Sequence, residues 1–332
     1  MRLLSRRDLL LSGSAFALTG IAGTHYDVLV VGAGAAGIAA ARTIRAAGGS
    51  ALILEASHRV GGRVAGSVLS NVSRRECGLH ALVARSGAST IAATSLPMRR
   101  MRDESPFAAT YAAMLTALIG AGELVRDGSA RDMHVYDAVR ALRERDGFRG
   151  ALALLGIDDE YRASLLDYHL VANRAASPFV FPADDTLIVP SGLHTVLADV
   201  AKGVPVVRDA RVTAIAYRGG EAVLRTEKGE TYRARRAIVT VPAGVLASRA
   251  IAFSPALPET IAAAVAALPM GVFGRVASSY ATVGNAGARS ALARHVDGTL
   301  WFAGEATAPP GFGCVEGAWE SGAAAARAAL TA

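Results

Sequence analysis

Apolar and polar positions alternate in blocks near the beginning of the chain and predict a strand, a helix and a second strand. Residues 26–31 form a short apolar run, a glycine turn follows, and an alanine-rich stretch of helical character comes next. A second apolar run ends at Glu55. Two strands joined through a helix pair in parallel, so this stretch predicts the first part of an α/β domain.

The middle of the chain has the apolar spacing of helices. Residues 107–124, 135–142 and 152–170 carry apolar side chains at helical intervals, and we interpret their methionines and aromatic residues as core. Prolines between residues 178 and 190 then break this pattern and predict a loop. We therefore expect a mostly helical unit that interrupts the α/β domain.

The next part of the chain predicts strands and one further helix. Residues 204–241 contain short alternating strands, with turns at Gly219–Gly220 and Lys228–Gly229. A loop with two prolines precedes a helical stretch over residues 259–268. A strand meander followed by a helix is thus expected after the helical unit.

The turn after the first predicted strand has the spacing of a dinucleotide-binding loop. Gly32 permits a sharp turn, Gly34 lets the main chain approach a pyrophosphate, and Gly37 lets the helix pack closely on the sheet. The N-terminus of the helix favours phosphate, and the Glu55 carboxylate can accept hydrogen bonds from ribose hydroxyls. This context favours a dinucleotide site over an ordinary β-α-β turn without a ligand.

A second glycine-rich segment, Arg59-Val60-Gly61-Gly62-Arg63, follows closely after Glu55. Its glycines allow the chain to fold back over the pyrophosphate, and Arg63 places a fixed positive charge on this loop. In a plain nicotinamide dehydrogenase this region would be an ordinary connection to a helix. The order GxGxxG, acidic strand end and RxGGR resembles the flavin-containing amine oxidase family, which includes monoamine oxidases, polyamine oxidases and L-amino-acid oxidases.

The resemblance continues through the rest of the chain. Residues 300–307 (LWFAGEAT) are similar to the family's strand and Gly-Glu element, which places the flavin ribityl chain. Residues 313–322 (GCVEGAWESG) are similar to the helix start that meets the isoalloxazine ring and the pyrophosphate. Residues 188–197 resemble a glycine-containing family segment, and 206–239 resemble the family's meander, where the backbone of Val212 would contact the adenine side.

The resemblance implies FAD as the cofactor and an α/β, Rossmann-like FAD-binding domain of the glutathione-reductase kind, beside a reduced and mostly helical substrate domain. We expect the FAD-binding domain to comprise residues 24–95, 186–250 and 297–332, and the substrate domain to comprise 96–185 and 251–296. The residues expected to contact FAD are Gly32, Gly34, Ala35, Ala36, Gly37, Glu55, Ala56, Arg59, Gly62, Arg63, Gly78, Leu79, Val212, Gly304, Glu305 and Val315.

Several positions depart from the family's pattern on the substrate side. The interval between Val276 and Leu300 is much shorter than in typical members, where it holds several strands and a helix. Arg275 stands where many members carry a lysine that faces flavin N5, and Cys314 stands where monoamine oxidases place an aromatic residue. Arg275, Cys314 and Trp319 are the candidate catalytic residues beside the flavin ring.

The resemblance implies an enzyme that oxidises a C–N bond of a small amine or amino acid by hydride transfer to flavin N5, with O2 as acceptor. Arg275 could instead pair with the carboxylate of an amino-acid substrate. Two alternatives stay open: a dehydrogenase or desaturase-type enzyme that acts on an apolar substrate, and a non-catalytic FAD-binding remnant or subunit. The short interval before Leu300 supports the second alternative, the non-catalytic remnant or subunit. In that case a partner subunit or a homo-oligomer would complete the site.

Residues 1–23 have the features of an export signal. The pair Arg6–Arg7 precedes an apolar run over residues 9–22, which is shorter than the roughly 20 apolar residues of a membrane-spanning helix. This pattern predicts a signal peptide, the twin-arginine export machinery as a partner, and a periplasmic protein. A chance arginine pair and retention of the segment as a membrane anchor are the alternatives.

Composition excludes some further classes of function. The chain of 332 residues has a net charge of +7, and its basic residues, all arginine except Lys202 and Lys228, are scattered among acidic and apolar residues. No basic stripe with interleaved aromatic residues predicts nucleic-acid binding. The two cysteines, Cys77 and Cys314, do not make a disulfide framework. No CxxC, HExxH or His/Asp cluster predicts a metal site.

Overall fold

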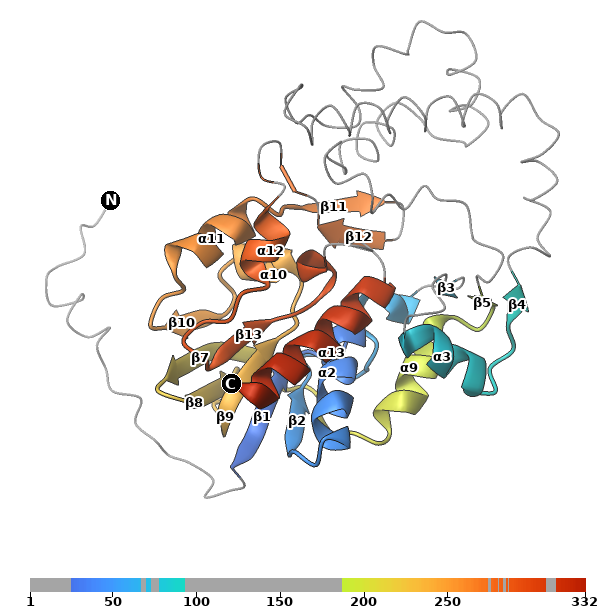
Figure 1. Cartoon of the computed structure of the whole chain (residues 1–332), viewed down its shortest axis with the longest axis horizontal. Coiled ribbons are helices and arrows are strands. Elements are labelled where there is room, and N and C mark those ends of the chain that lie inside the picture. The colour runs from blue at the N-terminus through green and yellow to red at the C-terminus, as the bar shows by residue number, and fades with distance from the viewer. Residues whose placement is uncertain are drawn as a thin grey trace, which may run out of the picture.

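The computed structural model describes residues 25–66, 70–72, 78–92, 187–273, 276–279, 281–282, 285, 287–308 and 315–332 (Figure 1). The predicted export signal, the three predicted helices between residues 107 and 170, Arg275 and Cys314 lie outside these residues. No helix in the described part of the chain has the length and apolar character needed to cross a bilayer.

A mixed sheet of eight strands forms the centre of the described structure. Its parallel strands are β6 (Val206–Val207), β2 (Ala51–Leu54), β1 (Tyr26–Val31), β9 (Thr231–Val239) and β13 (Leu300–Phe302). β9 pairs with β1 on one side and, near its end, also with β13. The strands predicted on either side of the glycine turn are therefore central in the sheet, and the predicted α/β class is confirmed.

An antiparallel meander extends the sheet beyond β9. It consists of β7 (Val212–Arg218), β8 (Glu221–Thr226) and β9, and β10 (Ala252–Ser254) pairs in parallel with β7. The strand order is β10-β7-β8-β9-β1-β2-β6. Positive φ angles at Gly219, Gly220 and Gly229 confirm both predicted turns. The predicted domain boundary at residue 250 does not coincide with a break in the sheet, because β10 is part of it.

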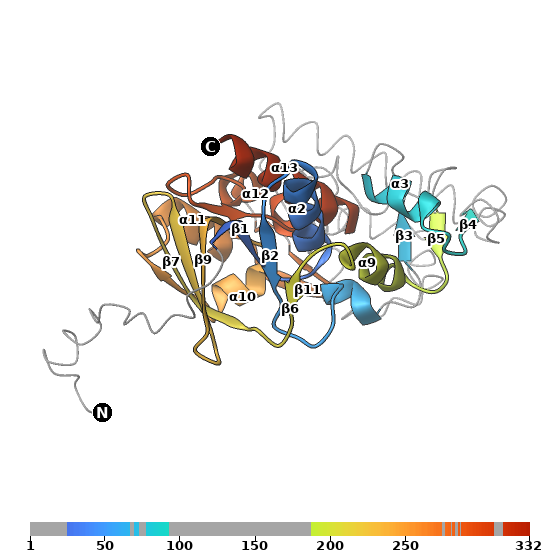
Figure 2. The same ribbon diagram turned by 90° about the horizontal axis from the view of Figure 1, so that it is seen from below.

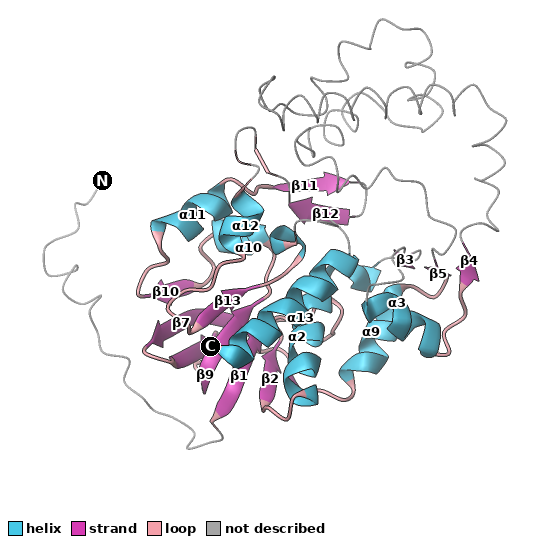
Figure 3. Cartoon of the chain, viewed as in Figure 1, coloured by secondary structure: helices cyan, strands magenta, loops and turns pink. Residues whose placement is uncertain are grey.

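Helices cover both faces of the main sheet (Figure 3). On one face, α2 (Ala35–Ala46) packs against α13 (Val315–Thr331), with α9 (Leu193–Ala201) and α3 (Gly78–Arg85) in the same core. On the other face lie α10 (Ala243–Ala247), α11 (Glu259–Ala266) and α12 (Ala288–Leu292). The helix predicted over residues 259–268 is thus present as α11 and ends two residues earlier.

Strand β1 contributes to both cores in alternation. Val28 and Val30 belong to the core beneath α2 and α13, whereas Leu29 and Val31 belong to the core shared by the meander, α11 and α12. All four side chains are buried. A parallel strand that is covered on both faces needs apolar residues at successive positions. This requirement explains the unbroken apolar run that predicts the strand.

Two small sheets and two short 3-10 helices complete the described structure. β3 (Ser70–Val72), β5 (Leu187–Val189) and β4 (Ile91–Ala92) form an antiparallel sheet, which Figure 2 shows at the end opposite to the meander. β11 (Met270–Phe273) and β12 (Val276–Ser279) form an antiparallel pair. The 3-10 helices η2 (Gly62–Gly66) and η5 (Glu305–Thr307) follow β2 and β13 in the chain.

Candidate functional site

Four parallel strands end side by side and bring distant segments of the chain to one edge of the sheet. The N–H of Gly32, after β1, donates to the carbonyl of Leu54 at 2.8 Å. The N–H of Thr240, after β9, donates to the carbonyl of Val31 at 3.0 Å, and the N–H of Ala303, after β13, donates to the carbonyl of Val239 at 3.0 Å. Ligands of open α/β sheets bind at such carboxyl ends, so this edge is the candidate site.

The three glycines of the first loop have different surroundings. Gly32 has a φ of 103°, and a Cβ there would lie 2.9 Å from Thr240 Oγ1. A Cβ on Gly37 would collide with the carbonyl oxygen of Gly32. A Cβ on Gly34 would meet nothing within 4 Å. Gly32 and Gly37 are therefore required by the fold itself, whereas the open space beside Gly34 is available to a ligand.

The N-terminus of α2 faces this open space without a side-chain cap. Gly34 is the N-cap residue, the first turn holds Ala35, Ala36 and Gly37, and it contains no acidic residue. Uncapped N–H groups at the positive end of a helix form a ready site for a phosphate group.

The Glu55 carboxylate is oriented by the backbone around it. Its Oε2 accepts the N–H of Ala33 at 2.6 Å, and its Oε1 accepts both the N–H and the hydroxyl of Ser57 at 2.8 Å. The side chain is buried at the strand end, and Ala56 beside it is exposed. Each carboxylate oxygen accepts more than one hydrogen bond, so the carboxylate can also receive the hydroxyl groups of a ribose.

The second glycine-rich segment folds back on the first. The N–H of Gly61 donates to the carbonyl of Ala33 at 2.8 Å, and a Cβ on Gly62 would lie 3.3 Å from Gly34 Cα. Arg59 is exposed, and its carbonyl accepts the Ser57 hydroxyl at 2.7 Å. The second glycine-rich segment therefore borders the open space beside Gly34, in addition to the N-terminus of α2.

Arg63 and Glu305 join the two ends of the chain. Nη1 of Arg63 lies 3.0 Å from Oε1 of Glu305, across 242 residues of sequence. The Arg63 side chain is one-third exposed, at 34%, and the Glu305 side chain is 5% exposed. Two residues expected independently to contact the cofactor therefore meet in one ion pair at the strand-end edge.

Two further residues hold Glu305, and the sequence did not identify them. The Ser279 hydroxyl on β12 donates to Oε2 of Glu305 at 2.7 Å, and its N–H donates to the carboxylate at 3.2 Å. Arg289 on α12 is buried, donates to the carbonyls of Glu305 and Ser279 at 2.9 and 2.7 Å, and lies 3.8 Å from Oε2. A buried carboxylate needs such partners, but no local motif marks them, because they meet only in the folded chain.

Gly304 forms the turn that presents Glu305. Its φ of 147° is accessible to glycine and rare for other residues. The Ser321 hydroxyl on α13 accepts the N–H of Gly304 and donates to its carbonyl, both at 2.9 Å. The Thr307 hydroxyl donates to the same carbonyl at 3.0 Å. The turn is therefore fixed from two directions.

The start of α13 lies beside the start of α3. The N–H of Gly78 donates to Oε1 of Glu320 at 2.8 Å, and a Cβ on Gly78 would lie 3.2 Å from Trp319 Nε1. Leu79 and Trp319 are buried in the same core, and Val315 packs partly buried against it. Gly78 and Trp319 are thus brought together, and Leu79, Trp319 and Val315 share one core. Their expected contacts with the cofactor stay predictions.

The loop before β7 is hydrogen-bonded to the main chain at the end of β2. The N–H of Ala210 donates to the carbonyl of Glu55 at 2.9 Å, and the N–H of Asp209 donates to the carbonyl of Ser57 at 3.2 Å. Val212, two residues further along, begins β7 and is buried. Its expected contact with the adenine side stays a prediction, and the fold places it next to the ribose-binding end of the site.

The arrangement fits a dinucleotide that carries an adenosine, a pyrophosphate and a second group. Open space lies beside Gly34 at the uncapped helix, and the oriented Glu55 carboxylate stands at the end of the neighbouring strand. The Arg63–Glu305 pair offers a further polar anchor at the same edge. Within the described residues, no group of His, Cys, Asp and Glu could hold a metal ion. The roles expected for Arg275 and Cys314 stay predictions.

Two family models match the chain. The model described as flavin containing amine oxidoreductase matches residues 99–284 and 273–330. The model for an NAD(P)-binding Rossmann-like domain matches residues 30–101. The second match covers the glycine loops, and the first includes β12, η5 and α13, so the two matches span both halves of the candidate site.

Curated relatives are longer than this chain. A lysine-specific histone demethylase 1 homolog 3 of Oryza sativa subsp. japonica is 26% identical over 298 residues, covering 77% of this chain and 35% of the relative. Polyamine oxidase 4 of the same organism is 26% identical over 298 residues, covering 77% of this chain and 59% of the relative. The chain thus spans about one third to three fifths of the length of these relatives.

Solved structures share the fold. Cyclohexylamine oxidase from Brevibacterium oxydans IH-35A superposes with a TM-score of 0.68 at 16% identity, covering 93% of this chain and 99% of that one. Putrescine oxidase bound to putrescine gives a TM-score of 0.66 at 15% identity, covering 93% of this chain and 100% of that one. Because the first family model also matches more than half of the sequence, the chain belongs to the flavin-containing amine oxidoreductase family, and its cofactor is FAD.

Proposed function

We propose that the protein oxidises a C–N bond of a small amine or amino acid, with O2 as the final electron acceptor. For a primary amine the balanced reaction is RCH2NH2 + O2 + H2O → RCHO + NH3 + H2O2. FAD, when bound, would supply the acceptor for the hydride that leaves the carbon next to nitrogen. Family membership supports the type of reaction, and the names of polyamine, cyclohexylamine and putrescine oxidases among the similar proteins support amines as the substrate class.

The observation that carries the proposal is the Arg63–Glu305 pair at 3.0 Å. It joins the loop expected to hold the pyrophosphate to the element expected to hold the ribityl chain. If the first β-α-β unit were only a structural element without a ligand, no ion pair between these two segments would be needed. The pair therefore supports one continuous cofactor site that extends from Gly34 toward the start of α13.

The residues of the chain would bind and orient rather than perform acid–base chemistry. The first turn of α2 would hold the phosphates, Glu55 the ribose, and Arg63 with Glu305 the middle of the cofactor. Oxidation of a neutral amine by hydride loss needs no protein base, so the protein contributes orientation of the substrate and exclusion of water. If Arg275 binds a substrate carboxylate, amino acids will be oxidised faster than the matching amines.

The decisive experiment is an absorbance spectrum of the purified protein, followed by anaerobic titration with benzylamine, putrescine and L-leucine. We expect a flavin spectrum that is bleached by at least one compound, and equimolar hydrogen peroxide once oxygen is admitted. A yellow protein that none of these compounds bleaches would reject the proposed activity and favour an FAD-binding subunit. Bleaching without peroxide would reject oxygen as the acceptor.

A matched pair of variants tests the site independently of the substrate. Gly34→Val fills the open space beside the helix, where a Cβ meets no protein atom within 4 Å. We expect a folded protein that has lost FAD. Gly203→Val, which also meets nothing within 4 Å, is the control and should retain FAD. Full FAD occupancy in Gly34→Val would exclude the pyrophosphate from this position.

We further propose export through the twin-arginine machinery, on the basis of the Arg6–Arg7 pair and the apolar run that follows. Replacement of both arginines by lysine retains the charge and removes the pair. We expect this double variant to accumulate in the cytoplasm, whereas the unaltered chain is recovered from the periplasm of the same cells. Equal distribution of both proteins would reject the proposal.

A further inference from the structure

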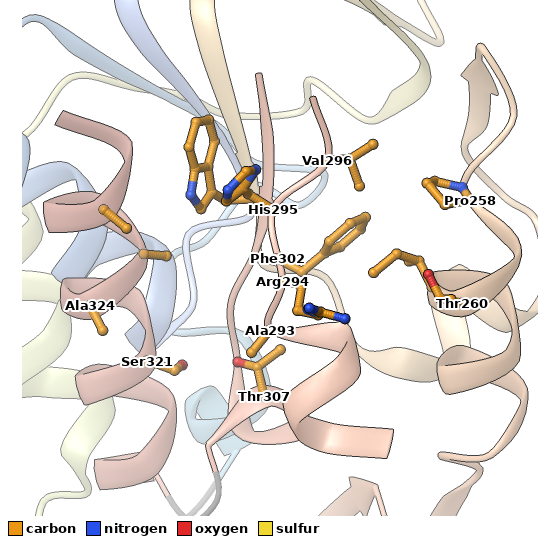
Figure 4. Close-up of a pocket in the computed structure, with 14 residues that line it drawn as sticks. Pro258, Thr260, Ala293, Arg294, His295, Val296, Phe302, Thr307, Ser321 and Ala324 are labelled. Atoms are coloured by element: carbon orange, nitrogen blue, oxygen red, sulfur yellow. The ribbon is translucent and has the colours of Figure 1, made fainter. Parts of the chain in front are cut away.

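A second cavity lies apart from the cofactor site, between α11, the end of α12, β13 and α13 (Figure 4). Its volume is about 590 Å3, which is within the range of small-molecule sites. None of the residues that line it belongs to the glycine loops, and neither Glu55, Arg63 nor Glu305 is among them. The cavity is therefore a candidate for a separate ligand.

The walls of this cavity are mostly apolar. Ile261 comes from α11, Val296 and Phe302 come from the segment around β13, and all three are buried. Three alanines of α13 line the opposite wall: Ala324, Ala325 and Ala328. Such walls favour an apolar ligand body over a sugar or another strongly hydrated compound.

The polar lining of the cavity combines the nitrogen donors of Arg294 and His295 with the hydroxyl groups of Thr260, Thr307 and Ser321. Arg294 and His295 line it, and none of the lining residues is acidic. Figure 4 shows the guanidinium of Arg294 next to Phe302, with Thr260 on the facing helix. Nδ1 of His295 accepts the N–H of Gly298 at 3.3 Å, so a neutral His295 ring carries its proton on Nε2 and remains a donor. These groups favour a ligand with an anionic acceptor.

Trp301 adds a buried donor. Trp301 lines the cavity and is 2% exposed. Its indole N–H has no hydrogen-bond partner among the described residues. The His295 ring is its neighbour, with a centroid separation of 5.6 Å. A buried N–H without an acceptor is unfavourable, but this nitrogen is closed to solvent, so an acceptor atom of a ligand reaches it only if the indole ring shifts.

We propose that this cavity binds a monocarboxylate with an apolar body. Arg294 and His295, two exposed residues on the segment that connects α12 with β13, would donate to the carboxylate, and Trp301 lies beside them on β13. The apolar part would lie along Ile261, Phe302 and the alanines of α13. Carboxylates favour such charge-assisted hydrogen bonds to arginine.

An occupant of the cavity would also touch groups that hold the cofactor element. Thr307 and Ser321 line the cavity, and both hydroxyls donate to the carbonyl of Gly304, the residue before Glu305. Binding should therefore perturb the flavin absorbance of the loaded protein without displacing FAD. The site is independent of the substrate proposed above.

Isothermal titration of the FAD-loaded protein with 4-phenylbutyrate tests the proposal, with 4-phenylbutanamide as the uncharged counterpart. We expect the acid to bind at least about tenfold more tightly than the amide. Arg294→Ala should weaken binding of the acid by about tenfold, and Trp301→Phe by a smaller factor. Arg327→Ala is the matched control, because Arg327 lies on α13 and outside the cavity lining, and should leave affinity unchanged.

Three results would overturn the assignment: equal affinity for acid and amide, unchanged affinity in Arg294→Ala, or no detectable binding of the acid. The Gly34→Val protein separates the cavity from the cofactor site. If 4-phenylbutyrate still binds to it, the acid occupies the cavity; if binding disappears together with FAD, the acid binds at the flavin and the proposal is wrong. Neither measurement depends on turnover of an amine, so failure of the proposed oxidation would leave this test intact.

Discussion

The two halves of the cofactor site are built by different means. The first half, formed by β1, α2 and β2, depends on backbone: two glycines without room for a Cβ, an uncapped helix and a carboxylate oriented by N–H groups. The second half, formed by β13, η5 and α13, depends on buried side chains that meet around Glu305. We therefore expect the first half to be sensitive to substitutions that add a Cβ at its glycines. The second half should be sensitive to substitutions that remove a buried charged side chain.

Among the substitutions that test this difference, the largest loss of stability is expected at Arg289. Arg289→Leu would leave the Glu305 carboxylate and two carbonyls with fewer donors in a buried environment, and we expect a loss of about 3–4 kcal/mol in the free energy of unfolding, together with loss of FAD. Urea denaturation and the flavin content of the purified protein measure both effects.

Arg289→Lys is the matched control for this prediction. It retains the positive charge but not the fork that reaches Ser279 and Glu305 together, so it should fall between the unaltered protein and the leucine variant. A leucine variant with unchanged stability and full FAD would show that buried charge does not hold the second half.

The contact between the two halves should be nearly as sensitive. A Cβ on Gly322 of α13 would collide with the backbone of Ala36 on α2, so Gly322→Ala should force the helices apart at a cost of about 2–3 kcal/mol. Thermal unfolding gives the size of the effect. The control is Gly287→Ala, which meets no atom within 4 Å and has a negative φ. Equal stability of these two variants would refute the tight helix contact.

A smaller effect is expected at Thr240, which ties the first half to the end of β9. Its hydroxyl donates to the carbonyl of Val31 at 2.8 Å and lies 3.2 Å from that of Gly32. Thr240→Val preserves the shape of the side chain and removes these bonds, at a cost of about 1 kcal/mol. We expect FAD affinity to fall several-fold in a fluorescence titration, whereas Thr240→Ser should retain it. No change in the valine variant would mean that the hydroxyl is not needed.

The smallest effect is expected at the opposite end of β1, away from the cofactor. The N–H and the hydroxyl of Ser50 donate to Asp27 at 2.8 Å, and these bonds lower the pKa of the carboxyl below its ordinary value of 3.8. Asp27 therefore stabilises the fold above that pH, and its contribution disappears as the pH falls through the lower folded-state pKa. Because the side chain is 37% exposed, Asp27→Asn should cost less than about 1 kcal/mol at pH 7.

Denaturation at a series of pH values measures the Asp27 contribution. The difference between the aspartate and asparagine proteins should stay constant from pH 7 to about pH 5 and shrink at lower pH, as the pH passes the ordinary value of 3.8 toward the lower folded-state pKa. The FAD content should be the same in both proteins. A difference that grows with acidity, or a loss of FAD, would contradict the assignment.

Sequence patterns predicted the strand, turn and helix of the first half because the interactions that form them are local, whereas the contacts of its residues with FAD stay predictions. Gly32, Gly34, Gly37 and the strand end at Glu55 act through the backbone of neighbouring residues, so spacing alone reveals them. The main sheet, the meander turns and α11 followed from apolar periodicity for the same reason.

The second half was predicted only through its resemblance to a family. Ser279 and Arg289 have no local motif, since their partner Glu305 is reached only after folding. Leu79 is buried in the same core as Trp319, and its expected contact with the cofactor stays a prediction. The expected domain boundary at residue 250 precedes β10, whereas β10 pairs with β7 in the main sheet.

Arg63 and Glu305 are separated by 242 residues of sequence. This separation has a consequence for how the pocket forms during synthesis of the chain. Chains leave the ribosome with the N-terminus first, so the glycine loops emerge long before the partners that complete their pocket. Until α13 has been synthesised, the face of α2 around Ala36 lacks the helix that packs against it in the folded protein. The complete pocket can therefore form only after α13 has been synthesised.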